Sequence, residues 1–150
     1  MPAPSVALRR TGRPRHSGVA NDLGDAVTDD LKAIETVLWT YFDGMHEGDV
    51  GKLGAAFHES ADLRGVAPDG TLAVLPRAQW LEAVKGRPSP RSQDLPRHDA
   101  IVTIDRSGPA TAFAKVQCAI PPRYFTDYLT LAKLADGWKI VGKTFHTDTR

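Results

Sequence analysis

The apolar residues of this chain change their spacing near His58, and this change limits the folds open to it. Before His58 they recur every three or four residues, which places them on one face of an amphipathic helix. In the second half of the chain they alternate with polar residues, as in a strand with one buried face. Helices followed by strands favour an α+β fold with a mostly antiparallel sheet.

Two helices are predicted before the first strand, and a third is predicted after the second strand. Thr28 is expected to cap the first helix, which should end near Gly48. Asp49 should cap a shorter second helix, and residues 77–86 read as a third helix with Trp80 on its buried side. The apolar face of the first helix is formed by Leu31, Ile34, Leu38, Tyr41, Phe42 and Met45.

Two short strands and a longer meander complete the pattern. A Pro-Asp-Gly turn at residues 68–70 separates the short strands. The six strands are expected at residues 61–67, 71–75, 100–105, 110–120, 124–134 and 138–146. Residues 87–99, rich in proline and arginine, read as a long loop that could serve as a lid or binding segment.

The last hairpin decides which side chains face the core. A three-residue loop at residues 135–137 would pair Tyr128 with Thr144, and Asp127 with Phe145. A loop of two or four residues would exchange these partners, so the inward face of residues 124–134 stays open.

Composition excludes several classes of protein. The chain has 150 residues, which fits one domain, and a net charge of +1, which gives no global basic field for nucleic acid. No segment approaches the apolar length of a membrane span, and the single cysteine excludes a disulfide framework. We therefore expect a cytoplasmic protein with no nucleic-acid or membrane partner.

The basic charge is concentrated at the start of the chain. The first 21 residues contain four arginines and no acidic residue, and the rest carries 15 basic against 18 acidic side chains. We interpret residues 1–25 as a disordered basic tail and residues 26–150 as the domain. A transit peptide or a basic arm stays an alternative for the tail.

Four segments carry a resemblance to a known family. They are Tyr41-Phe42-Asp43-Gly44-Met45-His46-Glu47-Gly48-Asp49, Phe57-His58, Asp127-Tyr128-Leu129 and Gly137-Trp138-Lys139-Ile140-Val141-Gly142-Lys143-Thr144-Phe145-His146. Across residues 28–147 the chain resembles the nuclear transport factor 2-like (NTF2-like) superfamily, and more narrowly its putative lumazine-binding branch, next to the polyketide-cyclase-like (SnoaL-like) branch. The resemblance implies a cone in which three N-terminal helices pack on a curved, mostly antiparallel mixed sheet around an apolar cavity. It also implies a homodimer through the outer face of the sheet.

The neighbouring ketosteroid-isomerase-like branch offers a test of catalytic residues. Its enzymes use a carboxylate base on the strand after the second helix and a tyrosine from the first helix. Tyr41 lies on the first helix and could take the role of this tyrosine. The alternative is that Tyr41 is a core residue whose hydroxyl bonds to a backbone carbonyl. Gly65 stands where the base is expected, and glycine cannot abstract a proton. Asp62 could substitute only through a shifted register, so the isomerase mechanism is not supported.

Histidines and one carboxylate are the other candidates for acid–base chemistry. His58 and His146 could each enter the pocket or be structural. None of the histidines forms a short-spaced metal-ligand pair, so no metal is expected. Asp127 lies in an apolar strand, where a carboxylate needs a partner such as Lys143 or Lys133. Such a pair could be a cross-strand ion pair on a half-exposed face, or it could tune Asp127 for acid–base work.

The remaining polar and aromatic residues of interest have plain structural explanations beside functional ones. Cys118 is expected to be an inert buried thiol. The loop arginines Arg87, Arg91 and Arg97 are either solvated or recognise a carboxylate or phosphate. No phosphate-binding loop or dinucleotide fingerprint is present, so no cofactor is expected.

Two functions follow from these candidates, and the sequence leaves open whether the protein is an enzyme. The first is small-molecule binding, with an apolar or heterocyclic ligand in a cavity lined by Tyr41, Phe57, His58, Trp80, Tyr128 and His146. The alternative is a cofactor-free cyclase, isomerase or dehydratase in which His146 or Asp127 is the acid–base group and Tyr41 donates a hydrogen bond. A third possibility is a dimerisation module whose cavity is filled by side chains.

Overall fold

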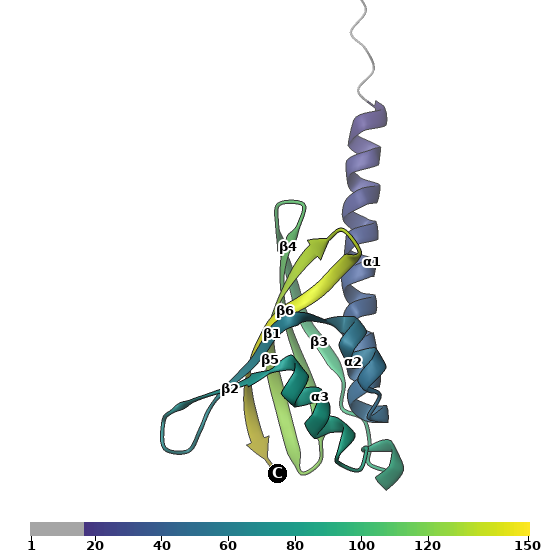
Figure 1. Cartoon of the computed structure of the whole chain (residues 1–150). Coiled ribbons are helices and arrows are strands. Elements are labelled where there is room, and N and C mark those ends of the chain that lie inside the picture. Colours follow the sequence, from purple (N-terminus) through teal and green to yellow (C-terminus); the bar gives the residue numbers. More distant parts are fainter. Residues whose placement is uncertain (1–16) are drawn as a thin grey trace, which may run out of the picture. The chain divides into compact units, whose positions relative to one another are not determined.

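The computed structural model describes the backbone of residues 17–150 and side chains from residue 24 onward. Residues 32–150 form one compact α+β unit, and the described residues before them continue helix α1 towards its N-terminus (Figure 1). Of the tail predicted at residues 1–25, the first 16 lie outside the described residues. Its remainder, from Ser17 on, is helical.

Helix α1 spans Ser17–Glu47 and begins earlier than predicted. Thr28 is not its N-cap: the Thr28 hydroxyl lies inside the helix and donates to the Gly24 carbonyl at 2.9 Å. A threonine can satisfy its hydroxyl in this way at mid-helix, so its presence does not fix a helix start. The predicted end is confirmed, because α1 stops at Glu47 and Gly48 adopts a φ of +67°.

Helices α2 (Val50–Ala56) and α3 (Arg77–Lys85) form as predicted. The Asp49 carboxylate caps α2 by accepting the backbone N–H of Lys52 at 3.1 Å. Arg77 ties the start of α3 to the end of α2, because its guanidinium donates to the carbonyls of Gly54 and Phe57 at 3.0 and 2.8 Å.

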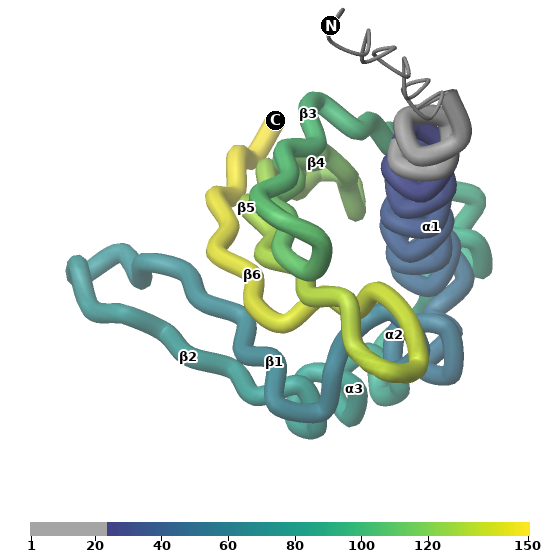
Figure 2. The backbone as a smooth tube through the Cα atoms, turned by 90° about the horizontal axis from the view of Figure 1, so that it is seen from above, coloured from purple at the N-terminus to yellow at the C-terminus, as the bar shows by residue number. Residues whose placement is uncertain are grey.

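The sheet has six strands in the order β2-β1-β6-β5-β4-β3. They are β1 (Phe57–Val66), β2 (Leu72–Pro76), β3 (Ala100–Ser107), β4 (Thr111–Ile120), β5 (Arg123–Leu134) and β6 (Gly137–Thr149). Only β1 and β6 pair in parallel, and the other neighbours are antiparallel. The turn between β1 and β2 projects away from the other strands in both views (Figures 1 and 2). The prediction of an α+β fold with a mixed, mostly antiparallel sheet is confirmed.

The register of the last hairpin matches the predicted pairs, but the loop does not match its predicted length. Leu134 pairs with Gly137, which leaves a two-residue loop. An irregularity between Thr130 and Leu131 then admits one extra residue on β6, Val141, and restores the pairing of Asp127 with Phe145. Asp127 therefore faces the core, and its neighbour Tyr128 faces outward.

The core lies between this inner sheet face and the helices. Inward-facing residues of β4 alternate as predicted, since Ala112, Ala114, Val116 and Cys118 are all buried. No helix in the described part of the chain is both long and apolar enough to cross a membrane.

Candidate functional site

An apolar cavity of about 270 Å³ opens between the inner face of the sheet, α3 and the C-terminal end of α1. Its lining residues are Met45, Leu63, Gly65, Ala73, Leu75, Trp80, Arg87, Ile120, Arg123, Phe125 and Phe145. Only the two arginines among them carry a charge, and none is acidic. A concave, mostly apolar site with few polar groups is typical of small-molecule pockets.

Gly65 lies in this cavity wall against the ring of Phe145. A Cβ atom at residue 65 would stand 3.2 Å from the Phe145 Cζ, so the missing side chain lets the ring approach the strand. Asp62 does not replace the absent base. It pairs with Arg64 at 3.3 Å, and both side chains line a different pocket.

Behind the cavity wall lies a buried polar cluster formed by Tyr41, Asp127 and Lys143. The Tyr41 hydroxyl donates to Asp127 Oδ2 at 2.5 Å and accepts from Lys143 Nζ at 2.9 Å. The ammonium of Lys143 lies 3.6 Å from the same carboxylate oxygen. The predicted ion pair between Asp127 and Lys143 is therefore present, and it is buried rather than half-exposed: the two residues are 0% and 6% exposed.

The cluster adjoins the cavity through aromatic rings. Lys143 Nζ lies 5.5 Å from the ring centroid of Trp80 and 4.9 Å from that of Phe145, and both rings line the cavity. The second oxygen of Asp127, Oδ1, is buried and has no hydrogen-bond partner within the described part of the chain. All three residues of the cluster are buried, and none of them lines the cavity, although Lys143 is among the residues that line a polar groove on the other sheet face.

Burial raises the pKa values of two groups beside Asp127, the Tyr41 hydroxyl and the Cys118 thiol. It raises the pKa of Tyr41 well above 10, and the negative charge of Asp127 raises it further. Burial, followed by the same charge, raises the pKa of Cys118 to about 12. Both groups thus keep their protons at neutral pH, and the Cys118 thiol, as predicted, is a poor nucleophile.

Three of the six predicted lining residues lie at or behind this cavity. Trp80 lines it, and Phe57 and Tyr41 pack against Trp80 with ring centroids 4.9 and 6.4 Å away. These contacts place three of the four aromatic residues of the predicted set together around α3.

The other three predicted residues lie elsewhere. His58 is within hydrogen-bond distance of Ser60, 2.8 Å from its hydroxyl. His146 is exposed and lies 2.9 Å from the Asp148 carboxylate. It lines a hollow of about 410 Å³ that shares Gly65, Ala73 and Phe145 with the cavity. Tyr128 lies on the opposite sheet face because the register turns Asp127 inward.

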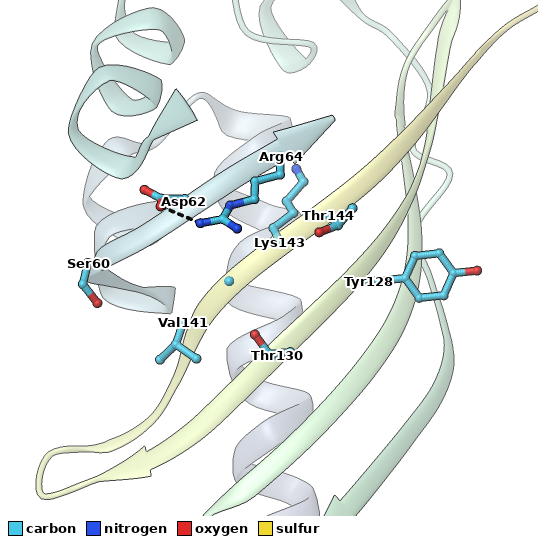
Figure 3. Close-up of a pocket in the computed structure, with 9 residues that line it drawn as sticks. Ser60, Asp62, Arg64, Tyr128, Thr130, Val141, Lys143 and Thr144 are labelled. Carbon is cyan, nitrogen blue, oxygen red and sulfur yellow. Dashed lines mark hydrogen bonds and ion pairs between the residues drawn. The ribbon is translucent and has the colours of Figure 1, made fainter. Parts of the chain in front are cut away.

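Tyr128 lines a polar groove of about 350 Å³ across β1, β6 and β5 (Figure 3). The Asp62–Arg64 ion pair lies at one side of this groove, and Thr130 and Thr144 add hydroxyl groups. Tyr128 also stacks on Phe113 at 6.0 Å, with Lys115 Nζ 5.6 Å from the tyrosine ring centroid. The groove therefore belongs to the outer face of the sheet and not to the apolar cavity.

The cavity arginines were only partly predictable. Arg87 stood among the candidate anion-binding residues, and it is the one of the three loop arginines that reaches the cavity. Arg97 instead bridges the carboxylates of Asp43 and Asp99, at 2.7 Å each. Sequence reasoning missed Arg123. Its only signal is its place directly after Pro121-Pro122, where the chain turns back into the sheet.

No metal-ligand cluster forms in the part of the chain that the structure describes, in which no group of three His, Cys, Asp or Glu side chains could hold an ion. The cavity itself offers no such ligands, since its polar side chains are both guanidinium groups.

Solved structures share this fold. An NTF2-like protein of unknown function from Shewanella baltica OS155 is 27% identical, with a TM-score of 0.73 over 82% of this chain and 97% of that one. A second from Methylobacillus flagellatus KT is 28% identical, with a TM-score of 0.70 over 81% and 94%. A putative scytalone dehydratase from Novosphingobium aromaticivorans DSM 12444 is 19% identical, with a TM-score of 0.60 over 84% and 89%, and this likeness concerns the fold alone.

No curated protein matches the chain. The family described as "Putative lumazine-binding" matches residues 29–146, which is most of the chain and includes the cavity and the buried cluster. The chain therefore belongs to the putative lumazine-binding family within the NTF2-like superfamily.

Proposed function

We propose that this protein binds a small molecule in the apolar cavity lined by Trp80. The observation that carries the proposal is the cavity itself: about 270 Å³, walled by aliphatic and aromatic side chains, with two arginines as its only charged lining residues. An engineered apolar cavity of about 150 Å³ holds benzene, so this one has room for a ring with substituents. The family description adds a heterocycle of the lumazine type to the candidate ligands.

Binding is favoured over catalysis by the chemistry of the lining. A proton-transfer enzyme needs an acid or base within about 3 Å of the reacting atom. The cavity lining contains no Asp, Glu or His, and Gly65 occupies the position expected for an isomerase base. Guanidinium groups bind and orient anions but keep their protons at neutral pH.

A cofactor-free cyclase, isomerase or dehydratase is the alternative, and the buried cluster is the observation in its favour. Asp127 has one oxygen held by Tyr41 and another without a hydrogen-bond partner in the described part of the chain. Access to it from the cavity would require Trp80 or Phe145 to move, because Lys143 lies against both rings. His146, the other proposed acid–base group, is exposed beside the neighbouring hollow.

We also propose a cytoplasmic homodimer that associates through the outer sheet face. The support is the stacked pair of Phe113 and Tyr128, since Tyr128 is 46% exposed on a face that also carries Lys115. Light scattering coupled to size exclusion would give a dimer mass for the native chain. Tyr128→Glu should lower that mass to the monomer's by placing a charge in the interface.

Native mass spectrometry of the purified chain tests ligand binding, followed by denaturation and identification of any released molecule. Ala73→Phe should fill the cavity, because Ala73 lines it. Val74→Phe is the matched control, since Val74 follows on the same strand, is 47% exposed and does not line the cavity. A ligand that is retained by the native chain and by Val74→Phe, and lost from Ala73→Phe, supports the proposal. A ligand retained equally by all three places the site elsewhere.

A further inference from the structure

Arg87 projects a charge into an apolar site without a countercharge. Its side chain is half-buried and lines the cavity, and its guanidinium reaches the Met45 sulfur at 4.0 Å. No carboxylate in the described part of the chain forms an ion pair with it. Burying part of a charged group without a partner costs free energy, so such an arrangement calls for an explanation.

Arg123 adds a second positive charge to the same cavity from the start of β5. It lies over the ring of Phe125, 5.7 Å from the ring centroid, and likewise forms no ion pair with a carboxylate of the described residues. Burial lowers the pKa of Arg87, and repulsion from Arg123 lowers it further. Arg123 is itself exposed, so only Arg87 is partly desolvated, but the two unneutralised guanidinium groups line the same small cavity and a bound anion would relieve their repulsion.

This positive charge is local and does not reflect the composition of the domain. Beyond the basic first 21 residues the chain has 15 basic and 18 acidic side chains, so its overall balance is acidic. The neighbouring Arg97 shows how the fold treats a structural arginine, since two carboxylates neutralise it. Arg87 and Arg123 differ from it, because neither forms an ion pair with a carboxylate in the described part of the chain.

We propose that the cavity binds an organic anion, an aromatic ring system carrying one carboxylate, with the ring against Trp80 and Phe145 and the carboxylate on Arg87 and Arg123. This inference rests on the proposed function and names its ligand class. The flat ring matches the aromatic walls, and a guanidinium offers paired N–H donors in the geometry that a carboxylate accepts. A volume of about 270 Å³ admits a fused pair of rings better than a larger polycycle.

Calorimetric titration of the full chain with 2-naphthoate and with its neutral analogue 2-naphthamide tests the charge requirement. A hydrogen bond to a charged group contributes enough to change affinity about tenfold or more, so the acid should bind at least about tenfold more tightly than the amide. Arg87→Gln and Arg123→Gln should each weaken binding of the acid far more than binding of the amide, and so remove most of this preference. Arg91→Gln is the matched control, because Arg91 is exposed on the same loop and does not line the cavity.

The possible outcomes separate this inference from the proposed function. Equal binding of acid and amide, abolished by Ala73→Phe, would overturn the anion inference and leave the cavity as a ligand site. Equal weakening by Arg91→Gln and Arg87→Gln would also overturn it, since the preference would then come from general charge. Failure of both probes to bind would overturn the aromatic-acid class, and empty native mass spectra alongside it would overturn the proposed function as well.

Discussion

Replacing Lys143 with methionine should destabilise the fold far more than a typical lysine substitution. Lys143 is 6% exposed and lies 3.6 Å from the fully buried carboxylate of Asp127. Methionine keeps much of the side-chain volume but removes the charge. The carboxylate would then stay buried with only the Tyr41 hydroxyl and the weak thiol donor of Cys118 to stabilise it.

The expected loss is about 3–5 kcal/mol, the usual cost of leaving one member of a buried ion pair without its partner. A domain of this size is stable by about 5–15 kcal/mol, so the variant should fold but with much of its stability gone. At about 4 °C per kcal/mol its melting temperature should fall by about 12–20 °C. Lys32→Met is the control: Lys32 is exposed on α1, and its substitution should change stability by less than about 0.5 kcal/mol.

Urea unfolding of a double-mutant cycle checks the physical cause. Asp127→Asn alone should also be costly, since it leaves the ammonium buried without its countercharge. The double variant Asp127→Asn/Lys143→Met should be more stable than the sum of the single losses predicts, by about 1–3 kcal/mol. Strictly additive losses, or a loss below about 1 kcal/mol for Lys143→Met, would refute the buried ion pair.

Three further predictions concern pH, packing and capping. Because burial raises the pKa of Cys118 to about 12, the folded state holds the thiol proton more tightly than the unfolded chain does. The free energy of unfolding should therefore fall as pH rises above about 8.5, and this thiol should contribute about 1.4 kcal/mol of the fall per pH unit. Urea unfolding at several pH values checks this, because Cys118→Ala should remove this contribution to the pH dependence. Gly44→Ala should lose about 1–3 kcal/mol despite better helix propensity, since its Cβ would lie 2.8 Å from a Leu53 methyl; an unchanged melting temperature would contradict this. Asp49→Ala should lose about 0.5–2 kcal/mol through the missing cap of α2, whereas Asp49→Asn should retain most of that stability.

Much of the fold follows from the spacing of apolar residues. The start of α2 is marked by local chemistry, because the Asp49 carboxylate caps it and acts within a few residues. The start of α1 is not marked in this way, because Thr28 satisfies its hydroxyl inside the helix. The apolar stripe of a helix shows where it is buried and does not show how far it continues beyond the core.

The candidate site was less predictable because it depends on one irregularity of the sheet. The two-residue loop before β6 would by itself have shifted Asp127 to a different partner on β6. The extra residue Val141 shifts the register back, so that Asp127 pairs with Phe145. Nothing in the local sequence marks Val141, so the inward turn of Asp127 could be stated only as one of two alternatives. The pairing with Lys143 was predictable from charge, but the complete burial of the pair follows from tertiary packing.

The cavity arginines depend on tertiary structure even more strongly. Arg87 and Arg123 are far apart in the chain and meet because the loop after α3 and the start of β5 line the same cavity. A basic residue on a loop is usually solvated, so their shared location gives no sequence signal.

The most direct test of the account is the position of a bound ligand, read from the indole N–H signals of the three tryptophans in a ¹H–¹⁵N spectrum. Trp80 lines the cavity, whereas Trp39 is 46% exposed on α1 and serves as an internal control. We predict that 2-naphthoate shifts the Trp80 signal, assigned with Trp80→Phe, in a saturable way and leaves the Trp39 signal in place. Saturable binding that leaves the Trp80 signal unmoved would contradict the account, because the ligand would then lie outside the cavity.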